Sequence, residues 1–238
     1  VVANDPNLNH IFDFTETGAF NIANFPVETT SEITFVNITT LNHLYWSSPG
    51  PESRNIVTIN FPVLTEMSDF EMRNEFSIRK IYAPVLQTIT NFNLINTSTI
   101  EVIFTSLESI TIISNNYGKI EGNSSLENLD FPQLQKIKLT SDYRNFNITN
   151  NNALISIDWG GLQTIETSFI YNYFRINDNS SLQEIKLNNL TSSECYMNFY
   201  ENDSLNLIEF NSLVNAHRSI FIGSNINLTS VQAPQLFS

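Results

Sequence analysis

Two acidic residues occupy equivalent positions in neighbouring segments of this sequence and could work as a pair. Asp130 and Asp158 each precede an aromatic residue, in the segments LENLDFPQL and LISIDWGGL. If these segments are neighbouring strands of a parallel sheet, the two carboxylates lie roughly 5 Å apart. That separation suits a cation site or the acid pair of a retaining glycosidase. The alternative, which we favour, is a solvent-facing sheet that carries the two acids incidentally.

No other familiar catalytic or metal-binding pattern occurs in the sequence. The three histidines, His10, His43 and His217, are far apart and show no metal-ligand spacing. There is no Gly-rich phosphate loop, nucleophile elbow or Cys-x-x-Cys pair. The single cysteine, Cys195, excludes an internal disulfide framework and is expected to pack in the core. We therefore expect a protein that is not an enzyme, with no catalytic residue, no metal and no cofactor.

The two acids belong to a longer row of residues that should face solvent. In each segment these residues alternate with a central aliphatic residue, so they point away from the core of a strand. A flat parallel sheet of this kind offers a wide surface to a protein or a glycan. The candidate ligand face consists of Lys80, Tyr82, Glu101, Asp130, Asp158, Glu184, Lys186 and Glu209.

The segments are parts of a repeat with the frame Asn-x-x-Leu-x-x-Ile-x-Phe-Pro-x-Leu. One position of the frame, which we call the anchor, holds an aromatic or smaller apolar residue. The anchors are Phe61, Ala83, Phe104, Phe131, Trp159, Leu187, Phe210 and Ala233, and they are 21 to 28 residues apart. The third residue after every anchor is Leu, and the second residue before it is always aliphatic. Columns that stay fixed across unequal spacings indicate a stacked repeat with a continuous core.

The repeat predicts a mainly β fold, a right-handed parallel β-solenoid. The anchors give eight coils and a weaker ninth centres on Phe35, so we expect about eight to nine coils of 21–28 residues. Each coil should contain two or three short strands. One strand precedes the anchor, and another precedes the Asn, at 146–148, 174–176, 197–199 and 220–222.

The frame also divides the chain into two parts. Residues 1–52 are expected to form an N-terminal capping region and an atypical first coil, and residues 53–238 the repeat solenoid, a single continuous domain. Residues 45–51, YWSSPGP, are expected to form a surface loop. The frame stops inside a repeat at Leu236, so we expect the solenoid to be truncated at this end.

Charge and hydropathy exclude two kinds of partner. The formal net charge of −13 argues against nucleic acid, whose phosphates require a basic surface. No apolar run reaches 18 residues, so we expect no membrane span in this chain.

The Leu-x-x-Ile-x-Phe-Pro-x-Leu unit with its Asn-rich turn resembles the receptor L-domain group of leucine-rich-like solenoids. It is most similar to the fungal GPI-anchored cell-wall proteins of that group, over about residues 53–238. The resemblance implies a role in cell-surface or cell-wall organisation and no catalytic residues. It also implies a lipid anchor in a part of the protein outside this sequence. The sequence departs from the resemblance in two features. It lacks the flanking cysteines of animal receptor L domains, and it lacks the lipid-attachment signal of the fungal group.

Eight Asn-x-Ser/Thr sequons bear on the cellular compartment: Asn37, Asn96, Asn123, Asn147, Asn179, Asn189, Asn202 and Asn227. A chain so rich in Asn, Ser and Thr would contain nearly as many by chance, so their number alone proves little. Asn96, Asn123, Asn179 and Asn202 occupy the Asn position of the repeat, where a side chain can instead form an inward ladder that satisfies turn backbone. For these four, ladder and glycan compete, and we favour the turn role.

We therefore expect a non-enzymatic extracellular module of the cell surface or cell wall with a structural, organising role. Its partner would be a cell-wall glycan or a surface protein. A second candidate function is a receptor-like or adhesive ectodomain that binds a protein or glycan on the exposed sheet face. A third is a polysaccharide-active β-helix enzyme.

Overall fold

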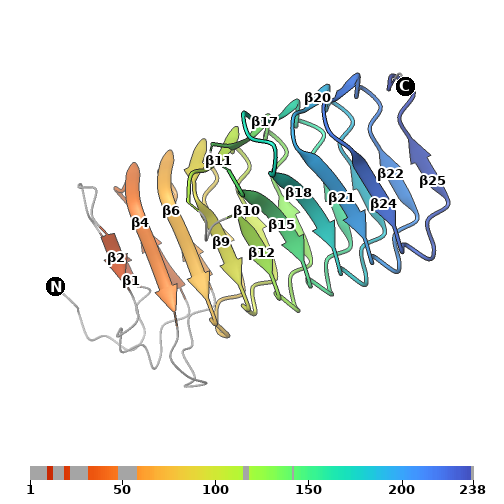
Figure 1. Cartoon of the computed structure of the whole chain (residues 1–238). Helices are drawn as coiled ribbons and strands as arrows, with labels where there is room; N and C mark the ends of the chain where they lie inside the picture. The colour runs from red at the N-terminus through yellow and green to blue at the C-terminus, as the bar shows by residue number, and fades with distance from the viewer. Residues whose placement is uncertain are drawn as a thin grey trace.

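The computed structural model describes residues 10–12, 19–21, 32–47, 58–114, 118–140 and 142–236. Within these residues all regular structure is β-strand, the strands pair in parallel, and the chain winds into a β-solenoid (Figure 1). The described part of the chain contains no helix that is long and apolar enough to cross a membrane. The predicted mainly β, parallel solenoid is confirmed.

The first row of strands carries the segments that precede the anchors. It consists of β1 (His10–Phe12), β3 (Glu32–Phe35), β5 (Thr58–Asn60), β7 (Lys80–Tyr82), β10 (Glu101–Ile103) and β13 (Asn128–Asp130), followed by β16 (Ser156–Asp158), β19 (Glu184–Lys186), β22 (Leu207–Glu209) and β25 (Ser230–Gln232). The row is divided into two sheets, because β13 and β16 do not pair. From β5 to β25 the chain completes about seven turns.

Two further rows complete each coil. The second row is β8 (Thr88–Thr90), β11 (Ser109–Ile112), β14 (Lys136–Leu139), β17 (Thr164–Thr167), β20 (Ser192–Ser193) and β23 (Asn215–Ala216). The third row is β9 (Phe92–Ile95), β12 (Lys119–Glu121), β15 (Asn145–Thr149), β18 (Tyr173–Asn177), β21 (Tyr196–Tyr200) and β24 (Ile220–Gly223). The predicted strands at 146–148, 174–176, 197–199 and 220–222 lie in this third row.

At the N-terminal side the second and third rows merge into one. There β2 (Ala19–Asn21) pairs with β4 (Thr40–Ser47), and β4 pairs with β6 (Glu66–Arg73). The first half of β6 pairs with β8 and its second half with β9, so the wide sheet splits after β6. The loop predicted at 45–51 is therefore wrong for Tyr45 to Ser47, which end β4, and Trp46 is fully buried. Residues 48–51 and most of the predicted capping region lie outside the described residues.

The core follows the repeat frame. From β5 to β22 the aliphatic residue in the middle of each first-row strand and the anchor behind it are buried. Neighbouring anchors stack along the axis, with ring centroids of Phe35 and Phe61 4.7 Å apart and those of Phe104 and Phe131 5.6 Å apart. Parallel strands in register bring equal side chains together, which is why one apolar frame builds a continuous core.

The unequal coil lengths come from one place. The connection between the second and third rows is a single residue, Asn91, in one coil, but it spans 113–118, 140–144 and 168–172 in the next three. Extra residues here leave the register of all three rows unchanged. The anchor spacing of 27 and 28 residues in those coils is therefore explained by the number of residues between the second-row and third-row strands, not by the core.

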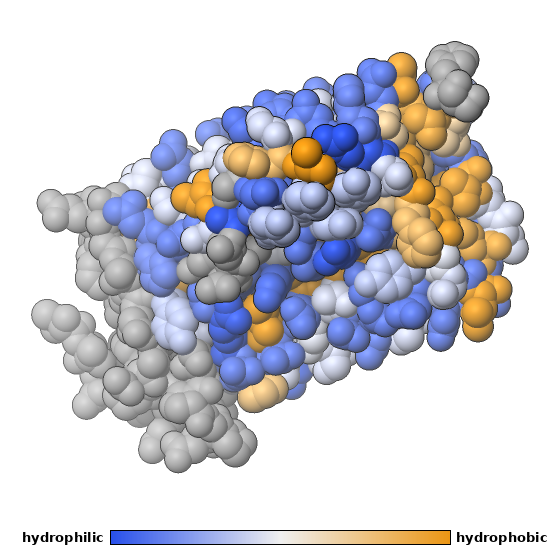
Figure 2. Space-filling model, viewed as in Figure 1, coloured by the Kyte–Doolittle hydropathy of each residue, from blue (hydrophilic) through white to orange (hydrophobic). Residues whose placement is uncertain are grey.

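The last coil is less covered than the others. Phe221 is 55% exposed, Ile226 78% and Val231 47%, whereas Ile208, which occupies the position of Val231 one coil earlier, is fully buried. Figure 2 shows apolar residues gathered at this end of the molecule.

Candidate ligand face

The residues of the candidate ligand face lie in register within each of two sheets. Thr58, Lys80, Glu101 and Asn128 follow one another in register, and so do Asn60, Tyr82, Ile103 and Asp130. In the second sheet Glu184 pairs with Leu207, and Lys186 lies between Asp158 and Glu209. All of these side chains flank a buried central residue and reach solvent at least in part.

Most charges on this face are neutralised by their neighbours. Lys80 Nζ lies 3.3 Å from Glu101 Oε2, and Lys186 Nζ lies 2.8 Å from Glu184 Oε2. The hydrogen bond to Glu184 raises the pKa of Lys186, and the negative charges of Glu184, Asp158 and Glu209 act in the same direction. Each of the two lysines is therefore paired with one acid of this face, Lys80 with Glu101 and Lys186 with Glu184.

The face is interrupted between β13 and β16. Phe104 N donates to Asp130 O at 3.2 Å on one side of the break, and Trp159 N donates to Lys186 O at 3.0 Å on the other. Across the break, Leu129 O accepts the indole Nε1–H of Trp159 at 3.3 Å. Trp159 is the largest of the anchors. Its indole therefore takes a carbonyl that would otherwise be available to the neighbouring strand, which separates the two sheets.

An open depression of about 270 Å³ lies at this interruption. It is lined by Glu101, Ile103, Asn128, Leu129, Asp130, Ser156 and Asp158. Asp130 and Asp158 thus share one surface feature, but their strands are not ladder neighbours. The separation of roughly 5 Å assumed a regular ladder between the two strands. Because β13 and β16 are not paired, that separation stays a prediction. In the described part of the chain no three His, Cys, Asp or Glu side chains are placed to hold a metal ion.

The Asn position of the repeat forms a buried ladder. Asn123, Asn151, Asn179 and Asn202 are fully buried, and each Oδ1 accepts the backbone N–H of the preceding member; Asn225 ends the series. Each Nδ2 donates to a third-row carbonyl, for example Asn151 Nδ2 to Ile120 O at 2.9 Å. The amides of Asn123, Asn179 and Asn202 are therefore committed to the turn, and we withdraw these three as N-glycosylation candidates.

Asn96 differs from the rest of its column. In this coil Thr97 fills the buried position, and its N–H and Oγ1–H both donate to Asn123 Oδ1, at 2.9 and 2.8 Å. Asn96 takes a left-handed φ of 51° and is turned to solvent. Asn37, Asn189 and Asn227 are exposed as well, and Asn147 is half-buried on β15. Five sequons therefore remain outside the core.

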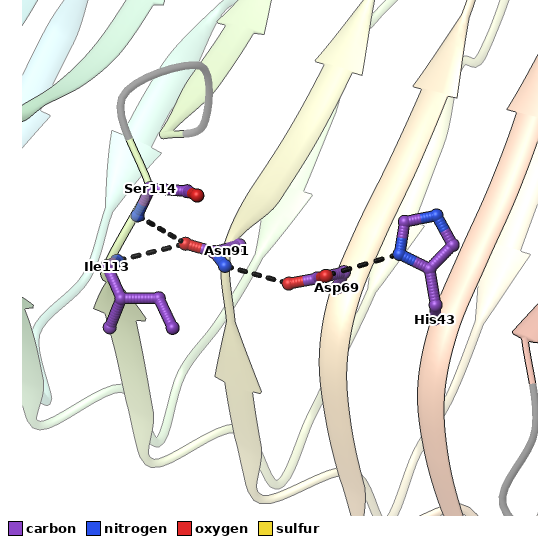
Figure 3. A network of polar contacts seen from close by, with 5 residues as sticks. All are labelled: His43, Asp69, Asn91, Ile113 and Ser114. Atoms are coloured by element: carbon purple, nitrogen blue, oxygen red, sulfur yellow. Dashed lines mark hydrogen bonds and ion pairs between the residues drawn. The ribbon is translucent and has the colours of Figure 1, made fainter.

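His43 belongs to a polar network that the sequence did not indicate. Its Nδ1 lies 3.2 Å from Asp69 Oδ2, and Asn91 Nδ2 donates to Asp69 Oδ1 at 2.7 Å (Figure 3). Asn91 Oδ1 in turn accepts the N–H groups of Ile113 and Ser114, at 2.9 and 3.1 Å. Asn91 has a left-handed φ of 61° and sits where the wide sheet splits. The network fixes that branch point (Figure 3).

Cys195 and His217 give no site. Cys195 is buried, and desolvation raises the pKa of its thiol to about 11, so it packs as a neutral group. His217 is exposed, and the side chain of His10 lies outside the described residues.

No protein-family model matches the sequence, and neither does any of the curated proteins or solved structures compared with it. What is established is thus the class of fold, a parallel β-solenoid, and the surfaces that it presents.

Proposed function

We propose that the chain is a non-enzymatic extracellular module of the cell surface or cell wall, with a structural and organising role. In this proposal it is a right-handed solenoid of the leucine-rich-repeat or receptor L-domain type. Each first-row strand in frame, β3 included, counts as one of its eight to nine coils. Cell-wall glycans or surface proteins are its partners.

The observation that carries the proposal is the placement of the sequons. A buried Asn cannot hold an oligosaccharide in the folded state, and Asn123, Asn179 and Asn202 have a structural reason to be Asn. The other five sequon asparagines have no such structural role in the core. Four of them are exposed, namely Asn37, Asn96, Asn189 and Asn227. Exposed sequons are what a glycosylated surface protein requires.

The test is the intact mass of the protein from its natural source, before and after enzymatic removal of N-glycans, with the sites mapped by peptide analysis. We expect glycans at some of the five accessible sequons and none at the three ladder positions. An unmodified mass would remove the main support for an extracellular module. Occupancy at Asn179 would contradict the placement of that side chain in the core.

The depression at the sheet break favours a second candidate, a receptor-like or adhesive ectodomain. It offers Asp130, Asp158, Asn128 and Ser156 around a recess on an otherwise flat face. Partners captured on the cell surface by chemical cross-linking should be lost from an Asp130→Ala/Asp158→Ala variant and kept by Asn206→Ala, whose side chain is exposed elsewhere. Equal capture by both variants would refute this candidate.

A further inference from the structure

The long connections between the second and third rows gather exposed apolar side chains on one edge of the solenoid. Ile113 is 51% exposed, Tyr143 67%, Ile170 52% and Tyr171 49%. All four belong to the connections between the second and third rows. Described stretches of these connections, 113–114, 142–144 and 168–172, lie along the edge where β11, β17 and β20 are labelled in Figure 1. In repeat proteins, insertions that collect on one face are commonly the binding face.

The two tyrosines form a stacked pair that the structure holds in place. Their ring centroids are 5.4 Å apart and their planes differ by 6°. Arg144 N donates to Oδ1 of the fully buried Asn172 at 2.8 Å, and Asn172 Nδ2 donates to Thr167 Oγ1 at 2.7 Å. These bonds tie the two connections to each other and to β17. The pair is therefore a fixed surface feature and not two independent side chains.

Tyr143 also has an unfavourable backbone. Its φ is 57°, in the left-handed region that bulky residues avoid. A glycine would adopt this conformation without strain. The chain instead places a large aromatic side chain there and exposes it, and retained strain of this kind is a mark of functional positions.

A polar recess begins at the foot of the same connections. Its volume is about 380 Å³, within the range of small-ligand sites, and it is lined by Lys138, Leu139, Thr140, Glu166, Thr167, Ser168 and Glu194. Tyr143 follows Thr140 by three residues, and Tyr171 follows Ser168 by three residues. Three residues of extended chain span at most about 10 Å, which limits the distance between each tyrosine and the recess. The stacked tyrosines and two lining residues of the recess, Thr140 and Ser168, thus belong to the same two connections.

The chemistry of this surface selects one class of ligand. The recess is lined by the hydroxyls of Thr140 and Ser168 and by the carboxylates of Glu166 and Glu194. The Thr140 hydroxyl donates to Ile112 O at 3.2 Å and can still accept a hydrogen bond. With the Ser168 hydroxyl, this set suits a ligand that both donates and accepts hydrogen bonds. Glu166 pairs with Lys136 at 3.1 Å, and Glu194 Oε2 accepts Thr167 N at 2.7 Å. With Lys138 beside them, the local charge is close to zero. The net charge of −13 further disfavours an anionic ligand.

We propose that the recess between β14 and β17 and the Tyr143–Tyr171 pair form a binding site for a neutral oligosaccharide. Hydroxyls of one sugar ring bond to the recess, and the apolar face of the next ring packs against the tyrosines. The site lies apart from the candidate ligand face and depends on the proposed function only for the source of the glycan.

The test uses the purified chain and a panel of neutral gluco-, manno- and chito-oligosaccharides, with binding measured by saturation-transfer NMR and calorimetry. We expect one member to bind and Tyr143→Ala to weaken it roughly tenfold. Phe76→Ala, a matched control whose ring is 55% exposed in another coil connection, should bind as the parent does.

Tyr143→Gly separates binding from folding. Glycine relieves the left-handed φ, so the urea midpoint should be equal to or above that of the parent, while the affinity falls as for Tyr143→Ala. The proposal is overturned if no neutral oligosaccharide binds at millimolar concentration, if only an anionic glycan binds, or if Tyr143→Gly binds unchanged. A chain that proves to be N-glycosylated yet binds no oligosaccharide would keep the proposed function and lose this site.

Discussion

Replacing Asn151 by Ala should destabilise the solenoid from its centre. Asn151 Oδ1 accepts Asn123 N at 3.1 Å, and its Nδ2 donates to Ile120 O at 2.9 Å. Alanine leaves the buried Asn123 N–H without an acceptor, which costs about 1–3 kcal/mol. The lost donor to Ile120 O adds about 1 kcal/mol. We expect the free energy of unfolding to fall by about 2–4 kcal/mol in total.

The assay is urea unfolding followed by the fluorescence of the two buried tryptophans, Trp46 and Trp159, and by far-ultraviolet circular dichroism; Trp159 is the anchor of the same coil as Asn151. Coincidence of the two probes checks that unfolding is cooperative, which a repeat protein does not guarantee. Asn206→Ala is the matched control, because its side chain is exposed and should contribute within about 0.5 kcal/mol.

A second substitution refines the reasoning. Thr97 fills the ladder position of its own coil and bonds to Asn123 Oδ1 through its hydroxyl. Asn151→Thr should therefore retain part of the ladder and lose less stability than Asn151→Ala. If Asn151→Ala proves as stable as Asn206→Ala, the ladder contributes nothing net and the argument from buried backbone groups is wrong.

Three further predictions follow from the core and the surface charges. Burial raises the pKa of the Cys195 thiol from 9.0 to about 11. The unfolded chain therefore releases the thiol proton at a lower pH than the folded chain does. The free energy of unfolding is unaffected below pH 9 and falls as the pH rises towards 11. The full loss is roughly 2–3 kcal/mol, and about 2 kcal/mol of it should appear between pH 8 and pH 10.5 as a fall in the urea midpoint that Cys195→Ala should not share. Phe131→Ala removes a ring that stacks on Trp159 at 5.5 Å and should cost about 3–5 kcal/mol in the same assay, against less than about 1 kcal/mol for Phe76→Ala. Lys80→Met breaks an ion pair whose side chains are 39% and 38% exposed, so its effect should be about 0–1 kcal/mol, and a larger loss would show that this pair is not screened by solvent.

The sequence by itself determined the core. Ile81, Val102 and Leu129 were assigned inward positions from alternation, and the structure buries all three in successive strands. The outward residues of the candidate ligand face followed from the same rule. For the Asn column the sequence left an inward ladder and a glycan as alternatives, and the structure shows the ladder. Alternation with a period of two and stacking of identical coils are properties of the local chain, repeated by translation, so they are written in the spacing of residues.

Only the tertiary structure decided which exposed residues act together. Asp130 and Asp158 are in the same column of the sequence frame, yet the indole of Trp159 reaches Leu129 O, 30 residues away, and breaks the sheet between them. Thr97 displaces Asn96 from the ladder, and two connections bring Tyr143 onto Tyr171. Such outcomes depend on side-chain volume and on contacts between coils, which the frame does not encode. The repeat therefore specifies the rod, and packing at its irregular positions specifies the sites upon it.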